Sequence, residues 1–470
     1  MTNNNTMEHD GFVINEKNIH ATLAKSAGGN ARIRDILRKS RELKGLSLED
    51  VAALTTVSTM ELLEELFAAA RYVKESIYGR RLVLFAPLYI SNLCSNECTY
   101  CAFRARNTMV KRRALNMEEI AREGMALIEQ GHKRVLLVAG ESYPSEGFSY
   151  ILRAIETLYS LKNKNGEIRR VNANIAPLTP EEFRELKATN IGTYQLFQET
   201  YHQETYHNVH IGGKKKDYMW RLTAMDRAME AGIDDVGIGV LFGLFDWRFE
   251  VLAIMQHIRY LEEKFGVGPH TISVPRLEPA TGSDLAAHPP YPVNDLDFKK
   301  IVAIIRLAVP YTGIIMSSRE TPNLRRETFA LGVSQISAGS RTNPGGYQEG
   351  DDEKHSAGQF ALGDHRFLDE VVRDVASLGY IPSFCTACYR LGRTGADFMD
   401  LAKPGAIKDH CDPNAMSTFM EYLMDYASPQ TRQEGEAAIE KFLPQMGEKQ
   451  EKTARKMLEK VAAGKRDVFC

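Results

Sequence analysis

The sequence predicts an α/β fold, a (β/α)8 TIM barrel with helices before it and a mainly α-helical domain after it. Between residues 81 and 380, short apolar runs alternate with amphipathic stretches, which is typical of repeated βα units. With 470 residues, the chain is long enough for such a barrel and for further domains. We therefore expect a helical lead-in over residues 1–80, the barrel over 81–380 and a C-terminal domain over 381–470.

The first part is expected to begin disordered and to continue as helices. Residues 1–18 are rich in Asn and have no hydrophobic periodicity. From residue 31 to residue 79 apolar residues recur at helical spacing, and Ile33, Ile36 and Leu37 share one face.

The barrel strands are expected to be buried on both faces, because the apolar runs are nearly continuous. We expect strands at residues 82–85, 135–139, 171–175, 193–197, 235–240, 271–274, 313–316 and 333–336. We expect helices at residues 118–130, 150–161, 181–188, 218–231, 247–265, 296–308 and 324–330, and a closing helix at 364–378. A doubly wound open sheet is the alternative that this alternation permits.

Polar residues follow several of these strands at the point where each strand ends. In a (β/α)8 barrel the chemistry lies at the C-terminal ends of the strands, so these side chains are expected to converge on one mouth. They are Glu141, Glu199, Arg276, Arg319, Ser337 and Ser340.

Three cysteines lie in one turn-sized loop directly after the first expected strand. Cys94, Cys98 and Cys101 are separated by three and then two residues, and Tyr100 precedes the last. A 4Fe-4S cube has four irons, so three thiolates leave one iron open to a ligand that is not protein. A zinc site or a redox CxxC motif is the alternative, but zinc sites usually supply four protein ligands.

A second group of three cysteines opens the C-terminal part. Cys385 and Cys388 form a CxxC motif, and Cys411 follows after 22 residues. This group indicates a second 4Fe-4S cluster with an open iron, which makes the C-terminal part an iron-sulfur domain. A Cys3His zinc site that uses His410 is the alternative.

The composition excludes several classes of partner. The formal net charge is −2 and the pI is about 6.7, so no global field favours nucleic acid or an anionic membrane. No apolar run approaches the roughly 18 residues that a membrane span needs. The polar opening lacks the pattern of a signal peptide, so we expect a cytoplasmic protein without a nucleic-acid or membrane partner.

The first cysteine loop resembles that of the radical S-adenosylmethionine (SAM) superfamily, in which SAM chelates the open iron. The whole chain resembles the HydG family, the radical SAM tyrosine lyases that mature FeFe-hydrogenase. The segments that carry this resemblance are the two cysteine groups, Gln198-Glu199-Thr200-Tyr201-His202, Arg221-Leu222 with Asp226-Arg227-Ala228, and Ser273-Val274-Pro275-Arg276. The barrel is also similar to ThiH, the tyrosine lyase of thiazole biosynthesis, but ThiH lacks the C-terminal cysteines.

The resemblance implies a barrel of the radical SAM type and a two-stage reaction. An external one-electron reductant would drive cleavage of SAM to methionine and a 5′-deoxyadenosyl radical. The radical would take hydrogen from the amine of L-tyrosine, and breaking the Cα–Cβ bond would give p-cresol and dehydroglycine. At the second cluster, dehydroglycine would give CO and cyanide on iron, for other hydrogenase maturation proteins and the H-cluster.

The resemblance also implies roles for the polar residues of the mouth. The guanidinium fork of Arg319 suits the tyrosine carboxylate, with Ser337 and Ser340 as hydroxyl partners. The residues expected to bind SAM are Tyr100, Glu141, Asn172, Glu199, Arg221 and Arg276.

His270 immediately precedes the sixth expected strand, so it should lie at the bottom of the barrel, opposite the Cys94 loop. The resemblance implies that His270 binds an additional labile iron beside the second cluster, since imidazole is a suitable donor. Dehydroglycine would then pass through the barrel, and small or polar inward residues such as Asn172 or Asn174 would leave a channel.

Two other functions remain open at this point. One is a ThiH-like tyrosine lyase that forms 2-iminoacetate for thiazole biosynthesis, or another radical SAM enzyme. The other is an iron-sulfur carrier or scaffold without enzymatic activity.

Overall fold

The computed structural model describes residues 12–26, 29–164, 166–348 and 358–470. Most of the N-terminal segment expected to be disordered lies outside these ranges. The prediction was wrong for residues 16–18, because α1 (Glu16–Ala24) begins there, with the Asn15 side chain accepting a hydrogen bond from the Asn18 amide.

The expected (β/α)8 barrel is confirmed, and the open-sheet alternative is wrong. Eight parallel strands follow one another in chain order around the sheet, and the last pairs with the first, with Val83 opposite Gln335. The strands are β1 (Arg81–Ser91), β3 (Arg134–Ala139), β4 (Arg170–Asn174), β5 (Tyr194–Gln195), β7 (Val236–Gly239), β8 (Thr271–Ser273), β9 (Gly313–Met316) and β10 (Gln335–Ser337). A closed sheet has no edge, and its strand ends form a top mouth and a floor.

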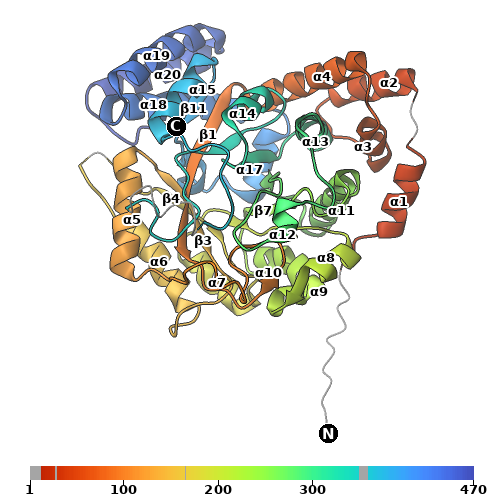
Figure 1. Ribbon diagram of the computed structural model, residues 1–470. Coiled ribbons are helices and arrows are strands. Elements are labelled where there is room, and N and C mark those ends of the chain that lie inside the picture. The colour runs from red at the N-terminus through yellow and green to blue at the C-terminus, as the bar shows by residue number, and fades with distance from the viewer. Residues whose placement is uncertain (1–11, 27–28, 165, 349–357) are drawn as a thin grey trace.

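Helices surround the strands, as Figure 1 shows. They are α5 (Met117–Gln130), α6 (Ser149–Ser160), α7 (Pro180–Ala188), α8 (Gln203–Val209), α9 (Tyr218–Leu222), α10 (Ala224–Glu230), α11 (Trp247–Phe265), α12 (Asp284–Ala287), α13 (Asp295–Ala308) and α14 (Pro322–Phe329). The helix expected over residues 218–231 is divided at Thr223. The Thr223 hydroxyl donates to the Met219 carbonyl and accepts from Arg227, and such back-bonding competes with the helical ladder.

The N-terminal helices cover one side of the barrel (Figure 1). They are α1, α2 (Asn30–Ser40), α3 (Leu48–Thr55) and α4 (Met60–Tyr78). α4 packs on α13, and α1 and α3 pack on α11, so this part shares its apolar core with the barrel.

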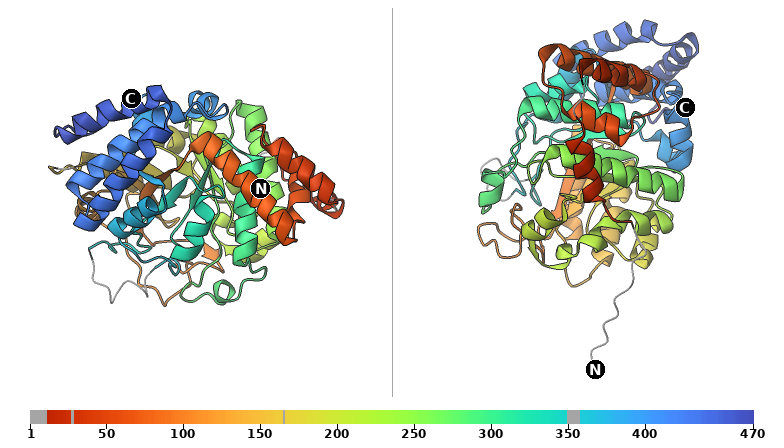
Figure 2. Two further views of the ribbon diagram at one scale, coloured as in Figure 1. Left: turned by 90° about the horizontal axis from the view of Figure 1, so that it is seen from above. Right: turned by 90° about the vertical axis from the view of Figure 1, so that its right-hand side faces the viewer.

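The C-terminal part is attached at the floor of the barrel. β11 (Ile381–Ser383) pairs with the first residues of β1, so it lies where the barrel strands begin. The helices of this part are α15 (Leu368–Ser377), which precedes β11, and then α16 (Ala387–Arg390), α17 (Gly395–Ala402), α18 (Lys408–Asp425), α19 (Pro429–Phe442) and α20 (Glu448–Ala462). Figure 2 shows the C-terminal helices gathered at one end of the molecule.

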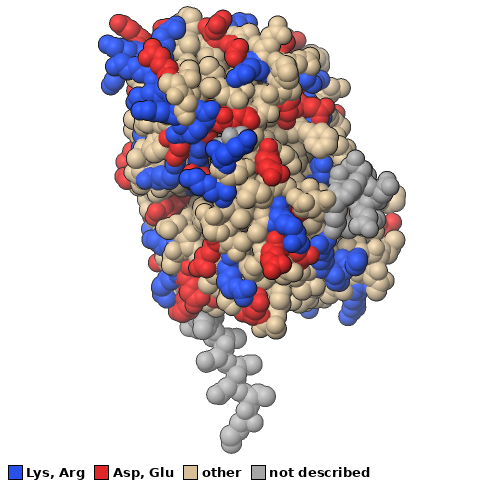
Figure 3. Space-filling view, turned by 90° about the vertical axis from the view of Figure 1, so that its left-hand side faces the viewer, with Lys and Arg blue, Asp and Glu red and all other residues tan. Residues whose placement is uncertain are grey.

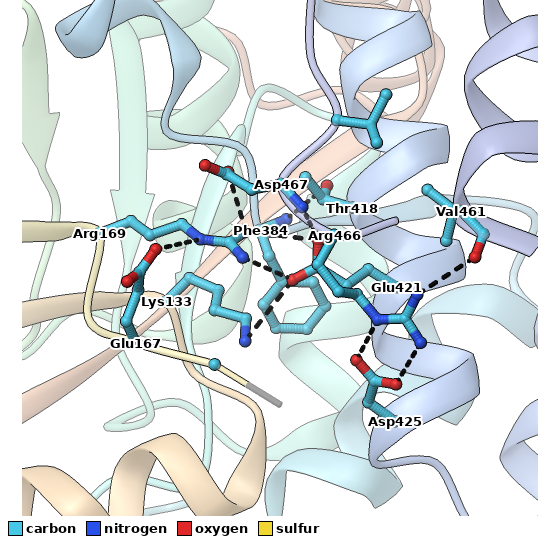
Figure 4. Close-up of polar contacts among 12 residues, drawn as sticks. Lys133, Glu167, Arg169, Phe384, Thr418, Glu421, Asp425, Val461, Arg466 and Asp467 are labelled. Atoms are coloured by element: carbon cyan, nitrogen blue, oxygen red, sulfur yellow. Dashed lines mark hydrogen bonds and ion pairs between the residues drawn. The ribbon is translucent and has the colours of Figure 1, made fainter. Parts of the chain in front are cut away.

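A buried cluster of charges fixes α18 to the barrel, as Figure 4 shows. Glu421 accepts a 2.8 Å hydrogen bond from Arg169 Nη2, lies 3.6 Å from Lys133 Nζ and also accepts from the Asp467 amide. Arg466 forms a double hydrogen bond with Asp425. Because an unpaired buried charge costs several kcal/mol, these pairs hold the C-terminal residues, α18 and the floor in one arrangement.

The exterior carries both signs of charge, and Figure 3 shows lysines, arginines and acidic residues interspersed over one face. Among the described residues, no helix has the length and apolar composition of a membrane span.

Candidate active site and metal centres

The first cysteine loop lies at the top mouth of the barrel, after the end of β1. Its central residues form β2 (Glu97–Cys98), which pairs with β6 (His210–Gly212) and is thereby anchored to the loop after β5. Cys94, Cys98 and Cys101 line a cavity of about 190 Å³ at this mouth. The expected position of the loop above the barrel is therefore confirmed by its geometry.

The environment of these thiols fits an iron-sulfur cluster. Burial and the neighbouring Cys94 raise the pKa of the Cys101 thiol to about 11, so the thiol needs a metal to become a thiolate at neutral pH. The Cys101 sulfur accepts from the Phe103 amide at 3.4 Å and faces the Gln359 amide nitrogen at 3.8 Å. In the described part of the chain, no three His, Cys, Asp or Glu side chains converge as a single metal ion requires. A cube spreads its ligands over separate irons, so this spacing favours a cluster over zinc.

An ion-pair network lies beside the cysteines in the same cavity. Arg221 Nη1 donates to Glu141 at 2.9 Å, and Arg221 Nη2 lies 3.5 Å from Glu199. Lys215 Nζ donates to Glu199 at 2.6 Å. Although burial opposes ionisation of Glu141, the charges of Arg221 and Lys215 and the hydrogen bonds from Arg221 and Asn96 together outweigh it and lower the Glu141 pKa, so the carboxylate stays ionised. The cavity therefore offers fixed carboxylates and cations to a zwitterionic ligand.

Glu199 has a backbone φ of +73°, which is rare for a residue with a side chain. Such a conformation costs of order 1 kcal/mol or more and persists only where the surroundings enforce it. Here the Glu199 carbonyl accepts from the Leu241 amide, and the next two residues are bound by buried Glu250. In this backbone conformation Glu199 lines the cavity.

Tyr100 lines the same cavity and is held by His210. The Tyr100 hydroxyl lies 2.7 Å from His210 Nε2, and His210 Nδ1 lies 2.8 Å from the Tyr206 carbonyl. Burial raises the pKa of Tyr100 and lowers that of His210, so both groups are neutral.

The opposite wall of the cavity carries a cation without a carboxylate partner among the described residues. Arg319 has its guanidinium over the Phe360 ring and donates a long, 3.4 Å hydrogen bond to the Arg276 carbonyl. Ser337 and Ser340 line the cavity with it, and the buried Ser340 hydroxyl has no hydrogen-bond partner within the described ranges. An unpaired guanidinium and an unpartnered hydroxyl fit an incoming carboxylate.

Two residues expected at the mouth have other partners. Arg276 is bound to Glu320 and Asp295 and does not line the cavity. Asn172 lies deeper in the barrel, where its Oδ1 accepts from the Arg170 Nε and from the Thr193 amide.

Sequence reasoning missed Lys215 and Glu278, which both line the cavity. Lys215 lies in the run Lys214-Lys215-Lys216, which is normally a solvated surface feature, yet it is only 9% exposed. Its backbone amide donates to the Asn96 side chain, which ties it to the cysteine loop. Glu278 lies a few residues after the end of β8, just beyond Arg276. This position after a strand end could have identified it as a residue of the mouth.

A second cavity, of about 50 Å³, lies at the floor of the barrel. Cys385, Cys388 and Cys411 line it together, although Cys411 is distant in sequence. The Cys385 sulfur accepts from the Ala387 amide at 3.5 Å, a contact suited to a cluster thiolate. His410 does not line this cavity, so the described residues favour a three-thiolate cluster over the Cys3His alternative.

His270 lines the same floor cavity, opposite in the barrel to the Cys94 loop. Its Nδ1 lies 3.5 Å from Asp235 Oδ1, and its Nε2 lies 3.2 Å from the Tyr389 hydroxyl. Burial lowers the His270 pKa, so the imidazole is neutral and able to bind metal.

Comparison with known proteins places the chain in a family. The Radical SAM superfamily model matches residues 88–255, and the Biotin and Thiamin Synthesis associated domain matches residues 273–381. A crystal structure of HydG, a maturase of the [FeFe]-hydrogenase, is 49% identical with a TM-score of 0.93, over 97% of this chain and 99% of that one. This chain belongs to the HydG family.

A second HydG structure, from Carboxydothermus hydrogenoformans, is 43% identical with a TM-score of 0.82, over 94% of this chain and 97% of that one. The 2-iminoacetate synthase of Escherichia coli is 33% identical over 338 residues, which are 72% of this chain and 86% of that protein. The chain is thus a radical SAM enzyme of the HydG family, and this membership implies a 4Fe-4S cluster and SAM.

Proposed function

We propose that this enzyme cleaves L-tyrosine to p-cresol and dehydroglycine, and converts dehydroglycine to CO and cyanide on iron for assembly of the FeFe-hydrogenase H-cluster. The atoms and electrons of both steps balance. Tyrosine divides into p-cresol and dehydroglycine; the hydrogen that the radical removes leaves in 5′-deoxyadenosine, and an electron from the external reductant with a solvent proton completes p-cresol. Dehydroglycine then divides into hydrogen cyanide, CO and water. The near full-length similarity to HydG supports this assignment.

One observation carries the proposal, namely two cysteine-lined cavities at opposite ends of one barrel. Cys94 lies on the upper cavity, and Cys385 and His270 lie on the lower one. A carrier or scaffold has no need of the 190 Å³ cavity with fixed charges beside Cys94, or of a histidine beside the second cysteine group. A 2-iminoacetate synthase needs only the upper one.

In the upper cavity, SAM on the Cys94 cluster supplies a 5′-deoxyadenosyl radical when both are bound. Glu141, Glu199, Arg221 and Tyr100 are proposed to orient SAM, since they are buried and fixed by one another or by the cysteine loop. Their ion pairs match the amine, carboxylate and sulfonium charges of that molecule.

Arg319 is proposed to bind the tyrosine carboxylate, with Ser340 and Ser337 beside it. The Arg319 guanidinium has no competing carboxylate within the described ranges, and the Ser340 hydroxyl is free to donate. The surrounding wall, which includes Tyr89, Phe103 and Leu136, is apolar and suits the phenol ring.

In the lower cavity, Cys385, Cys388 and Cys411 are proposed to hold an auxiliary 4Fe-4S cluster, and His270 an additional labile iron. The fit rests on two features. The thiols face one cavity, and His270 lines it with Asp235 3.5 Å behind its Nδ1, the side on which carboxylate–histidine–metal triads place their carboxylate.

Dehydroglycine is proposed to pass from the upper to the lower cavity through the barrel. On each of four strands, one inward residue lines the upper cavity and the next inward residue, two positions earlier, lines the lower cavity. At these strands, therefore, no complete layer of side chains lies between the two cavities. The pairs, upper residue first, are Phe85 and Val83, Leu136 and Arg134, Ile315 and Gly313, and Ser337 and Gln335. Asn174 lines the upper cavity and Asn172 lies one inward position below it.

The proposed partners follow from the reaction. An external one-electron reductant must reduce the Cys94 cluster, and other hydrogenase maturation proteins must receive the iron product. A cytoplasmic location is proposed because oxygen-sensitive clusters and a strong reductant require a reducing compartment.

The experiment that tests this function is anaerobic reconstitution, iron and sulfide analysis, and a product assay with tyrosine, SAM and reductant. We expect 5′-deoxyadenosine, p-cresol, CO and cyanide. The first two products without cyanide would assign the chain to the 2-iminoacetate synthase reaction, and no 5′-deoxyadenosine would contradict enzymatic function.

A further inference from the structure

Three neighbouring strands of the barrel begin with an arginine at the floor. Arg81 is the first residue of β1, Arg134 of β3 and Arg170 of β4, and Arg134 and Arg170 stand directly opposite in the register. Their side chains are between 1% and 6% exposed. Arg81 and Arg134 line the lower cavity together with the three cysteines and His270.

The hydrogen bonds of these guanidinium groups are incomplete. Arg134 Nη2 donates to the Cys385 carbonyl at 2.8 Å, which fixes the side chain beside the cysteine segment, but its buried Nε has no partner within the described part of the chain. The buried Nε of Arg81 is likewise without one. A buried unpaired donor on a cation is costly, so these atoms indicate a missing acceptor.

The carboxylates at the floor do not pair directly with these two arginines. Arg170 has Asp235 at 4.0 Å, and the charge of Asp412 acts on Arg81 and Lys74, but neither Arg81 nor Arg134 forms an ion pair with a carboxylate within the described ranges. Burial lowers the pKa of Arg170 to about 9, because the charge of Asp235 at 4.0 Å does not offset it. An oxidised 4Fe-4S cube on three thiolates carries about one negative charge in total. That charge and Asp412 together balance Arg81 and Arg134, so the unpaired Nε atoms of the two arginines, and not a net charge, indicate the missing acceptor.

We propose that Arg134 and Arg81 form an anion subsite on the barrel floor that binds the carboxylate of the two-carbon product of tyrosine cleavage beside the auxiliary cluster. This inference rests on the proposed function and adds the residues that receive the product. A carboxylate is the ligand that fits, because a guanidinium offers two parallel donors to its two oxygens. The subsite would retain the small product at the point where the path through the barrel ends.

The test is a titration with glyoxylate, the carboxylate formed when dehydroglycine is hydrolysed. The protein carries Cys98→Ala, so that the electron paramagnetic resonance signal comes from the auxiliary cluster alone, and neither tyrosine nor SAM is added. We expect a saturable change of the signal with glyoxylate and none with glycolaldehyde, which has two carbons but no carboxylate.

Arg134→Gln is expected to raise the glyoxylate dissociation constant at least about tenfold, and Arg134→Lys to restore part of the binding. Arg373→Gln is the matched control, because Arg373 lies on α15, does not line the lower cavity and donates to the Gln430 side chain. An unchanged dissociation constant in Arg134→Gln with an intact cluster signal overturns the subsite. If that variant does not hold its cluster, Arg81→Gln provides the same comparison, and an unchanged dissociation constant there overturns the subsite equally.

The outcomes separate this inference from the function on which it rests. Absence of p-cresol from the parent enzyme contradicts the proposed reaction. If p-cresol and CO production are normal but the glyoxylate dissociation constant is unchanged in both arginine variants, only the subsite is contradicted.

Discussion

His270 Nδ1 lies 3.5 Å from Asp235 Oδ1 beneath the barrel, and the two residues immediately precede neighbouring strands. Asp235 also accepts from the Gly395 amide at the start of α17, so its position is fixed from the C-terminal part. A carboxylate behind an imidazole sets the tautomer and the ring orientation of a metal ligand. We therefore expect the proposed additional iron to depend on a residue that does not contact it.

Asp235→Asn is expected to weaken binding of the additional iron by about 10- to 100-fold, since loss of such a partner misorients the histidine. The iron signal, followed by electron paramagnetic resonance during iron titration, measures this effect. His270→Ala should remove the same signal while the cubes and p-cresol formation persist. Asp234→Asn is the control, because Asp234 is exposed and contacts Thr394. Retention of the iron signal in His270→Ala would return that histidine to a structural role.

Cys98→Ala is expected to abolish SAM cleavage and with it every product. The loop holds only three thiols, so the cluster has no replacement ligand there. Cys94→Ala and Cys101→Ala should behave alike, and Cys470→Ala is the control, because Cys470 lies in neither group. Undiminished 5′-deoxyadenosine in any of the three variants contradicts the assignment of this loop.

Arg319→Lys is expected to raise the KM for tyrosine at least about tenfold, because lysine cannot form the two parallel hydrogen bonds of a guanidinium. Initial rates of p-cresol formation against tyrosine concentration measure this. SAM cleavage without tyrosine should be retained, and Arg326→Lys on exposed α14 is the matched control. An unchanged KM would remove Arg319 from the tyrosine site.

Buried Glu250 makes the free energy of unfolding depend on pH. Burial raises its pKa to about 8 in the folded protein, against about 4.3 in an unfolded chain. Between these values the folded state keeps a proton that the unfolded state has released, so the free energy of unfolding falls as pH rises, by up to about 1.4 kcal/mol per pH unit. Glu250→Gln should remove this slope, because the amide stays neutral and still accepts from the Tyr201 amide. Urea unfolding of the cluster-free protein at several pH values checks this, and an unchanged slope contradicts it.

The sequence predicted the barrel because short apolar runs alternate with amphipathic stretches, and several of these runs end in a polar residue. The position of Glu141 or Arg319 follows from that local pattern alone. The partners of such residues do not follow, since Arg276 also ends a strand yet is bound to Glu320 and Asp295. Long-range placement decides which strand-end cations stay available to a ligand.

The same limit explains what sequence reasoning missed. Lys215 looks like part of a solvated run, and only the pairing of β2 with β6 brings it into the upper cavity. β11 is too short to stand out, but its pairing with β1 brings Cys385 to Arg134. The role proposed for Asp235 could not be read from the sequence, because its neighbour His270 precedes the next strand.

The central claim is that tyrosine cleavage belongs to the upper cavity and CO and cyanide formation to the lower one. Replacing Cys385, Cys388 and Cys411 together by Ala and measuring p-cresol and CO in the same reaction tests it most directly. We predict that p-cresol formation stays largely intact while CO disappears, because the upper cavity contains none of these residues. Loss of p-cresol from a variant that keeps its fold and its Cys94 cluster would contradict the division.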